Sequence, residues 1–424
     1  MLTTKPIANS YWRHVFLLAS GNGLAQIVGV AGIPILTRLY SPEVFALQSI
    51  FVQVVAFLAA LVMLRFEYLV PLLRTKYEFL ALAKWAWKIG PLMVLVFSLL
   101  IFIVDMYGIS GYLKLDSIFF LYFAPITAFF ISLSLMYQFE AQRLNDFGGS
   151  AKSEVVSKIF YVASGVVFFA VMPVLGLLLT TLFGAIGRIL SLKSYFLDLI
   201  RHGKTSGKID NLLIDYRTRS IGLVVSNTIL TASSLLPLIF ISSQYGSNVA
   251  GQFALVLATV FLPSGLLGAA IGNVFYQRAA ALWNDGELKL LKSLWRETLV
   301  KLVIIALPVY GIIYFMAELI YPLVFGQQWQ QAGEFAKILT LSAFFSFISG
   351  PLDRLSLVLG FGRYLPFIHL LRLVLISLVV YFISNGNYGE YVFVICFSWA
   401  MSALYITDVF LCGVLLSLKL RAES

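Results

Sequence analysis

The feature that most constrains this chain is a succession of long apolar stretches, each of about 20 residues or more. A stretch of this length can cross the hydrocarbon core of a membrane as a helix. Hydrophobic residues make up 60% of the 424 residues and charged residues only 12%, too few to cover a soluble core of that size. The aromatic content of 15% excludes a disordered chain. The sequence therefore predicts an all-α polytopic membrane protein and excludes a soluble enzyme.

Turn residues divide the apolar sequence into twelve predicted transmembrane helices. Tyr40–Pro42 ends the first hairpin, Pro173 separates the fifth helix from the sixth, and Asn385–Asn387 separates the last two. The predicted helices cover residues 12–37, 43–65, 80–104, 117–138, 153–172, 174–197, 219–243, 250–276, 298–317, 332–352, 365–384 and 389–416.

Lysine and arginine are distributed very unequally between the two sides of this arrangement. If the N-terminus is cytoplasmic, all but three of the 30 basic residues lie on the cytoplasmic side, the exceptions being Arg38, Lys114 and Lys337. The positive-inside rule then predicts that both termini are cytoplasmic. The same distribution explains the net charge of +10 as a topology signal near anionic headgroups, so no nucleic-acid partner is expected.

The longest basic loop, residues 201–218, lies at the middle of the chain. It predicts an N-terminal six-helix lobe over 1–200, a cytoplasmic linker over 201–218 and a C-terminal six-helix lobe over 219–424. Residues 40–46 resemble residues 245–251, and at the same spacing Asn22 falls on Asn227. Two parallel halves related by an axis along the membrane normal are typical of transporters, whose site lies between the halves.

Five motifs, in their order and spacing, resemble a known family. They are Leu36–Phe45, Met63–Leu72, Ala250–Ala254, Pro263–Gly272 and Phe325–Gly333. Together they resemble the Wzx-type oligosaccharide flippases of the multidrug/oligosaccharidyl-lipid/polysaccharide exporter superfamily. Within the second motif the chain departs from the usual pattern by having phenylalanine rather than tyrosine between its arginine and its glutamate.

This resemblance implies two six-helix bundles and a function in surface polysaccharide synthesis, for O-antigen, capsule or exopolysaccharide. The implied substrate is an undecaprenyl-pyrophosphate-linked oligosaccharide, moved by alternating access from the cytoplasmic to the outer leaflet of the bacterial inner membrane. The candidate protein partners are a polymerase and a chain-length regulator in the same membrane.

Moving an anionic diphosphate across the membrane requires cations shielded from lipid, and arginine forms bidentate hydrogen bonds with phosphate oxygens. Arg65 and Glu67 lie at the predicted cytoplasmic end of the second helix. Either Arg65 is a topology anchor and Glu67 its counter-ion, or the two residues belong to a cytoplasmic vestibule that captures the diphosphate. Arg38 lies on the predicted outer side, where the topology rule disfavours it, so a gating role is a candidate. Arg278 ends the eighth helix, as an interfacial residue or as part of a cavity wall.

Uncharged polar side chains suited to sugar hydroxyls occur in the first, second, seventh and eighth predicted helices, which line the cleft in this family. They either contact sugar or only hydrogen-bond neighbouring helices, a packing role worth about 0.6 kcal/mol on average. The candidates are Asn22, Gln26, Gln53, Asn227, Asn273 and Gln277.

Asp408 is the acid placed well inside a predicted helix, and Arg372 lies deep in the preceding one. A charge at such depth is costly and needs a reason. Asp408 either pairs with Arg372 or couples transport to an ion gradient by taking up a proton.

The sequence contains no phosphate-binding glycine loop in the required strand context, no metal-ligand cluster and no catalytic triad. We therefore predict no cofactor, no metal site and no catalytic residue. Two alternatives remain: a multidrug or cation antiporter of the same superfamily, and a membrane glycan polymerase. The antiporter needs intramembrane carboxylates, and the polymerase needs a large outer loop, whereas the predicted outer loops are short.

Overall fold

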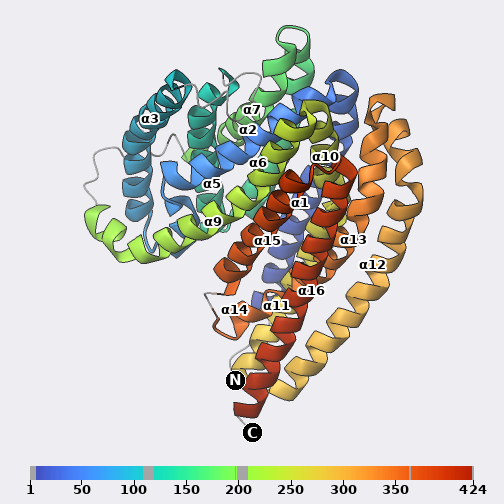
Figure 1. The fold of residues 1–424 in the computed structure, drawn as a ribbon. Coiled ribbons are helices and arrows are strands. Elements are labelled where there is room, and N and C mark those ends of the chain that lie inside the picture. Colours follow the sequence, from blue (N-terminus) through green and yellow to red (C-terminus); the bar gives the residue numbers. More distant parts are fainter. Residues whose placement is uncertain (1–5, 108–118, 196, 198–208, 362–363, 423–424) are drawn as a thin grey trace, which may run out of the picture. The chain divides into compact units, whose positions relative to one another are not determined.

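The computed structural model describes residues 6–107, 119–195, 197, 209–361 and 364–422 (Figure 1). Within these ranges the chain is helical and has no β-strand, as the composition predicts. The protein is an all-α polytopic membrane protein. Contacts group the chain into two compact units: unit 1 is Met1–Tyr40 with Leu47–Thr231, and unit 2 is Ser41–Ala46 with Ala232–Ser424.

The helices up to the middle of the chain are α1 (Pro6–Leu39), α2 (Pro42–Val62), η1 (Phe66–Leu72), α3 (Lys76–Met106), η2 (Phe119–Phe123), α5 (Ala124–Arg143), α6 (Phe147–Phe169), α7 (Pro173–Ser191) and α9 (Ile209–Tyr245). Those that follow are α10 (Ser247–Val260), η3 (Ser264–Gly268), α11 (Ala269–Asn284), α12 (Leu288–Phe325), η4 (Gln327–Trp329), α13 (Gln330–Leu352), α14 (Leu355–Val358), α15 (Tyr364–Gly386) and α16 (Glu390–Ala422).

Ten helical segments of the described chain are long and apolar enough to cross a membrane, where the sequence predicts twelve. The other two predicted helices correspond to α1 and α6. Of α1, only Gly23–Leu39 is described as an apolar segment, and it is shorter than a full crossing. α6 is 23 residues long, but its first half contains the charged residues Lys152, Glu154 and Lys158. The predicted orientation of the termini stays a prediction.

Residues that favour helix ends mark several of the boundaries. Thr75 caps α3 by accepting a hydrogen bond from the Glu78 backbone N–H at 3.2 Å, and Asp146 caps α6 by accepting one from Gly149 at 2.8 Å. Pro173 begins α7 after the break that the sequence predicts. The apolar run therefore becomes two helices at that point because proline cannot continue the first one.

In unit 1, α5 forms the buried centre and packs against η1, α3 and α7, while α6 packs against α1 and α7. Leu133 and Tyr137 of α5 are fully buried, and the Tyr137 hydroxyl accepts a hydrogen bond from Trp87 of α3 at 3.1 Å. α3 in turn exposes large apolar side chains such as Leu95 and Leu99. This distribution suits a bundle surrounded by lipid.

In unit 2, α13 is the buried centre and packs against α10, α12 and α16. Phe335, Leu339 and Phe347 of α13 are fully buried, whereas Phe315 and Leu323 of α12 are largely exposed. The outer helices therefore cover α13 and present apolar surface outward.

Ser41 and the first turn of α2, through Ala46, belong to unit 2. Asn248 at the start of α10 donates a hydrogen bond to Glu43 Oε1 at 2.6 Å, and Phe45 lies edge-on to Trp329. Gly251 approaches the Pro42 carbonyl so closely that a Cβ there would lie 1.8 Å from its oxygen. Glu43 and Asn248 occupy equal positions in the repeat that the sequence suggests.

The linker predicted over 201–218 is described only from Ile209 onward. Residues 198–208 lie outside the described ranges, but α9 begins at Ile209, so the second half of the predicted linker is helical. The two contact-based units also meet within α9, between Thr231 and Ala232. The division into lobes at 1–200 and 219–424 stays a prediction.

Candidate functional site

The second motif forms a buried, tightly turned segment between α2 and α3. Leu64 and Arg65 adopt left-handed backbone conformations, with φ of 47° and 60°, and η1 follows at once. Such conformations cost non-glycine residues of the order of 1 kcal/mol each and persist where surrounding contacts hold them. The turn brings Arg65 back over its neighbours, with the guanidinium carbon 5.0 Å from the Tyr68 ring centre and Nη1 3.4 Å from Glu67 Oε1.

Glu67 is more deeply buried than its partner. Its side chain is fully buried and that of Arg65 is 10% exposed. Its second carboxylate oxygen, Oε2, has no hydrogen-bond partner among the described residues. Burial raises the pKa of Glu67 to about 7, although the positive charge of Arg65 opposes the rise. Near neutral pH this carboxyl is therefore poised between its charged and neutral forms.

Contacts from distant helices hold this segment in place. Arg143 of α5 forms two hydrogen bonds of 2.6 Å to Glu140 and donates a third, at 3.5 Å, to the Leu73 carbonyl. Ser220 of α9 donates to the Leu64 carbonyl. Sequence reasoning missed Glu140, Arg143 and Ser220, because nothing local to them signals a role at a turn more than 60 residues away.

A second polar group lies within unit 1, around α6 and α7. Arg188 donates to Glu154 Oε2 at 2.9 Å and to Ser134 at 3.2 Å, while Gln138 donates to the other oxygen of Glu154 at 2.9 Å. Lys158, one turn after Glu154, has its ammonium 6.0 Å from the Tyr161 ring centre. Two cations and one anion therefore share this interior region, and Arg188 Nε is buried and donates to no group in the described part of the chain.

Among the side chains that the structure describes, the predicted polar residues of α1, α2 and α9 are not gathered into one hydrogen-bonded cluster. Gln26 is exposed on α1, Gln53 is half-buried on α2, and Asn227 of α9 donates to the Ala56 carbonyl at 3.4 Å. Arg38, in the last turn of α1, is exposed. The side chain of Asn22 lies outside the described part of the structure. For Asn227 the observed bond is the helix-packing alternative.

In unit 2, Asn273 of α11 accepts a hydrogen bond from Arg354, which follows α13. Gly272 permits this contact, since a Cβ there would lie 3.1 Å from Arg354 Nε and 3.1 Å from Pro351 Cα. Asn273, Gln277 and Arg278 are all exposed and make up the polar face of α11; that this face lines a cavity stays a prediction. Arg354 adds a cation to this face that sequence reasoning missed.

The eighth predicted helix is not continuous. α10 and α11 are joined by a π-helical segment, Ser264–Gly268, in which Ser264 contacts the Tyr310 hydroxyl at 2.8 Å and donates to the Ala343 carbonyl at 3.4 Å. Such segments interrupt the regular backbone hydrogen bonding and are frequent at functional sites. The polar face of α11 therefore begins directly after a break in the helix.

Asp408 is buried in unit 2, with 3% of its surface exposed. Ser349 of α13 donates to Oδ2, and the Tyr364 hydroxyl of α15 donates to Oδ1. The predicted ion pair with Arg372 is not formed, because Asp408 lies level with Tyr364, and Arg372 is eight residues, or about 12 Å, further along α15. Arg372 Nε is buried and donates to no group of the described chain. The Cys412 thiol, one turn further along α16, contacts the Tyr364 hydroxyl at 3.5 Å. Asp408 thus joins three helices.

The described residues contain no group of three His, Cys, Asp or Glu side chains that could hold a metal ion. What both units offer is a set of buried or clustered cations and hydrogen-bonding groups on long apolar helices. Such a set can bind an anionic, hydroxyl-rich headgroup without making or breaking bonds.

A family model described as "Polysaccharide biosynthesis protein" matches residues 35–334, which is more than half of the chain. The chain belongs to this polysaccharide biosynthesis protein family. The matched range includes the Arg65 turn, the Glu154 group and the polar face of α11. A search of curated proteins finds no match.

Solved structures share the fold of this family member at low sequence identity. The lipid II flippase MurJ, in an inward closed conformation, aligns with a TM-score of 0.68 and 16% identity over 96% of this chain and 87% of its own. An inward-facing multidrug resistance MATE family transporter of the MOP superfamily aligns with a TM-score of 0.66 and 10% identity over 96% of both chains. A MOP superfamily transporter from Pyrococcus furiosus aligns with a TM-score of 0.64 and 11% identity, over 95% and 94%.

Proposed function

We propose that this protein is a flippase for a lipid-linked oligosaccharide. On this proposal it moves an undecaprenyl-pyrophosphate-linked repeat unit from the cytoplasmic to the outer leaflet of the bacterial inner membrane, by alternating access and without catalysing a reaction. The observation that carries the proposal is the polysaccharide biosynthesis family match over residues 35–334 in a chain built of membrane-spanning helices. The likeness of its fold to a lipid II flippase supports it.

The distribution of charged groups suits such a substrate. A diphosphate requires cations, and the described residues provide Arg65 in its turn, Arg188 within unit 1, and Arg278 with Arg354 on or against the polar face of α11. Sugar hydroxyls require neutral polar groups such as Gln53, Asn273 and Gln277. A long prenyl tail needs no polar path, because it can stay in lipid while the headgroup crosses.

The proposal is tested in a strain that lacks the gene. Undecaprenyl-linked glycans are extracted after treatment of spheroplasts with a membrane-impermeant sugar oxidant, which reaches only the outer leaflet. We expect complete repeat units to accumulate on the cytoplasmic leaflet, and expression of this protein to reverse that accumulation. Complete single units stranded on the outer leaflet would instead indicate a defect in polymerisation and would contradict the proposal.

A multidrug or cation antiporter remains the alternative, supported by the similarity of the fold to a multidrug transporter. The residue that it would use is Asp408, whose described contacts are with Ser349 and Tyr364. An unchanged pool of lipid-linked glycans in the deletion strain, together with increased sensitivity to cationic drugs, would favour it.

A further inference from the structure

The outer helices of unit 2 leave an open groove on α13. Both α12 and α16 pack extensively against α13, but they make little contact with each other. The two helices therefore stand on either side of α13, which forms the floor between them. The groove opens outward, since Ile406, Phe410 and Leu418 of α16 line it and yet are 47%, 67% and 55% exposed.

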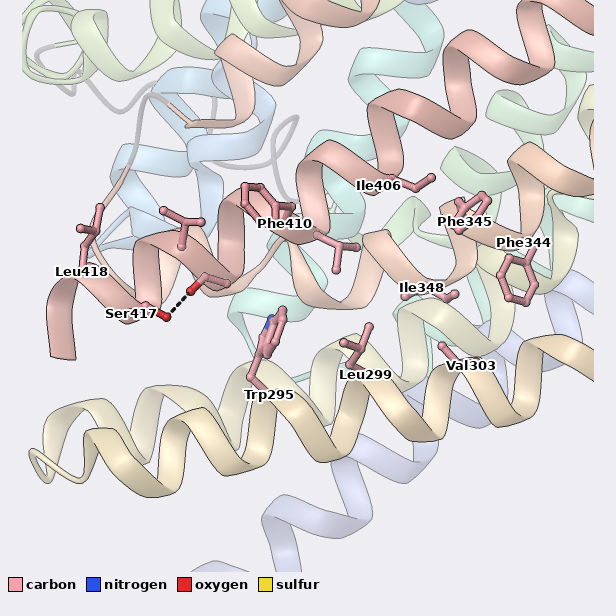
Figure 2. Close-up of a pocket in the computed structure, with 13 residues that line it drawn as sticks. Trp295, Leu299, Val303, Phe344, Phe345, Ile348, Ile406, Phe410, Ser417 and Leu418 are labelled. Atoms are coloured by element: carbon pink, nitrogen blue, oxygen red, sulfur yellow. Dashed lines mark hydrogen bonds between the residues drawn. The ribbon is translucent and has the colours of Figure 1, made fainter. Parts of the chain in front are cut away.

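Two apolar cavities follow one another along this groove. The first has a volume of about 750 Å³ and lies between Trp295, Leu299 and Val303 of α12 and the C-terminal half of α16 (Figure 2). The second, of about 630 Å³, lies between the Leu307–Tyr314 stretch of α12 and Trp399 of α16. Phe344 of α13 lines both cavities, so they adjoin at its ring.

The combined groove is as long as a membrane is thick. Its lining on α12 runs from Trp295 to Tyr314, which at 1.5 Å per residue spans about 28 Å. The hydrocarbon core of a bilayer is about 30 Å thick. An acyl chain of a phospholipid occupies one leaflet, or about half of that length, so the full groove matches a longer hydrocarbon chain.

Cations flank both ends of the groove. At one end, Arg296 follows Trp295 on α12 and Lys419 follows Leu418 on α16. At the other end Lys337 lines the second cavity itself and pairs with Glu318 at 2.8 Å. An anionic headgroup attached to a chain in the groove would therefore meet the positive charges of Arg296 and Lys419 at the first end and the Lys337–Glu318 pair at the other.

Trp295 shapes the first end of the groove. Its ring lies against Gly413 of α16, where a Cβ would be 3.1 Å from the nearest ring carbon. Its indole N–H is buried and donates to no group of the described chain. Glycine at this position lets the ring pack directly against α16, since a larger side chain would displace it.

We propose that this groove, the prenyl groove, holds the polyprenyl tail of the lipid-linked substrate while the headgroup crosses the membrane. This inference rests on the proposed function and extends it to the part of the substrate that the polar residues do not bind. The groove gives a long apolar chain one continuous surface through both leaflets, with Phe344 at the point where the chain passes from one cavity to the other.

The test uses the full-length protein with benzoylphenylalanine, a photoreactive residue, in place of Val303. The matched control carries it in place of Ile304, the next residue of α12, which is 62% exposed and lines neither cavity. Each protein is reconstituted in vesicles of phosphatidylethanolamine and phosphatidylglycerol that contain undecaprenyl diphosphate as the probe. After irradiation, mass spectrometry gives the ratio of polyprenyl to phospholipid adducts.

We expect this ratio to be several-fold higher at position 303 than at position 304. Equal ratios at the two positions would mean that ordinary acyl chains fill the groove and would overturn the inference. A second pair, Val303→Trp and Ile304→Trp, tests the groove without a photoreaction. Only Val303→Trp should lower the binding of radiolabelled undecaprenyl diphosphate to the purified protein, and equal binding by both variants would also overturn the inference.

The probe carries no sugar and the measurement requires no flipping, so the two proposals fail separately. Selective capture at position 303 with an unchanged glycan-lipid pool in the deletion strain would reject the proposed function and keep the groove. Flipping of the glycan-lipid without selective capture at position 303 would keep the proposed function and reject the groove.

Discussion

At the residue scale, Glu67 makes the protein sensitive to pH. The folded-state pKa of about 7 lies above the ordinary value of 4.5 expected for an unfolded chain. Between these two pH values the unfolded state has released its proton and the folded state still holds it. The contribution of Glu67 to the free energy of unfolding is therefore fully present below pH 4.5 and is lost as the pH rises through 7. The full difference amounts to about 3 kcal/mol as an upper value.

We predict that the melting temperature of the detergent-solubilised protein decreases between pH 5 and pH 8, and that Glu67→Gln removes much of this decrease. Glutamine has nearly the same shape and no charge to bury. The control is Glu287→Gln, at an exposed position just before α12, which should keep the dependence of the wild type. An unchanged pH dependence in Glu67→Gln would show that this carboxyl does not titrate in the range.

Asp408 provides a second test at this scale. Removing its carboxylate with Asp408→Ala leaves the hydroxyls of Ser349 and Tyr364 without their acceptor in a buried place, which costs about 1–3 kcal/mol. In a double-mutant cycle with Tyr364→Phe we predict a coupling energy of about 1 kcal/mol or more, measured by thermal unfolding. Additive effects of the two substitutions would mean that the hydrogen bond contributes nothing.

At the element scale, the first turn of α2 contacts α10 so closely that only glycine fits at position 251. We predict that Gly251→Ala destabilises the protein by about 3 kcal/mol or more, because the new methyl group would overlap the Pro42 carbonyl and push the helices apart. Gly265→Ala, in the π-helical segment, meets no atom within 4 Å and should change stability little. Equal melting temperatures for the two variants would contradict this account of the contact.

The sequence predicts helical elements better than it predicts the contacts between them. Hydrophobicity and turn residues locate the break at Pro173 and the boundaries around Tyr40–Pro42, since both signals are local. The π-helical segment after α10 was not predicted. Its residue Ser264 contacts Tyr310 of α12 and Ala343 of α13, and such contacts between helices leave no local signal in the sequence. The helical start of α9 was missed because a run of charged residues favoured a loop.

The same limit applies to the candidate site. Arg65, Glu67 and Asp408 stand out in the sequence because charge is rare in an apolar chain. The hydrogen-bond partners of Asp408 do not stand out, since serine and tyrosine, here Ser349 and Tyr364, occur throughout the helices. The expected pairing of Asp408 with Arg372 was wrong because residue type and depth alone cannot say which face of a helix meets which neighbour.

At the scale of the whole molecule, the bias of basic residues predicts that both termini are cytoplasmic. The exposed turn residues Asn387 and Asp285 then lie on opposite sides of the membrane. In a background with Cys396→Ala and Cys412→Ala, we predict that Asn387→Cys reacts with an impermeant maleimide in intact spheroplasts and that Asp285→Cys reacts only after permeabilisation. The opposite labelling pattern would mean that both termini lie on the outer side of the membrane and would contradict the prediction.

The measurement that tests the central claim most directly is flipping by the purified protein in proteoliposomes. Undecaprenyl-pyrophosphate-linked oligosaccharide is placed in both leaflets, and a glycosidase or oxidant added outside reports the fraction that becomes accessible. The account predicts that the wild type makes nearly all of the substrate accessible, and that Arg65→Ala and Arg278→Ala slow this without preventing reconstitution. Accessibility that stops at the half initially outside, in vesicles that contain folded wild-type protein, would contradict the claim that this chain is a flippase.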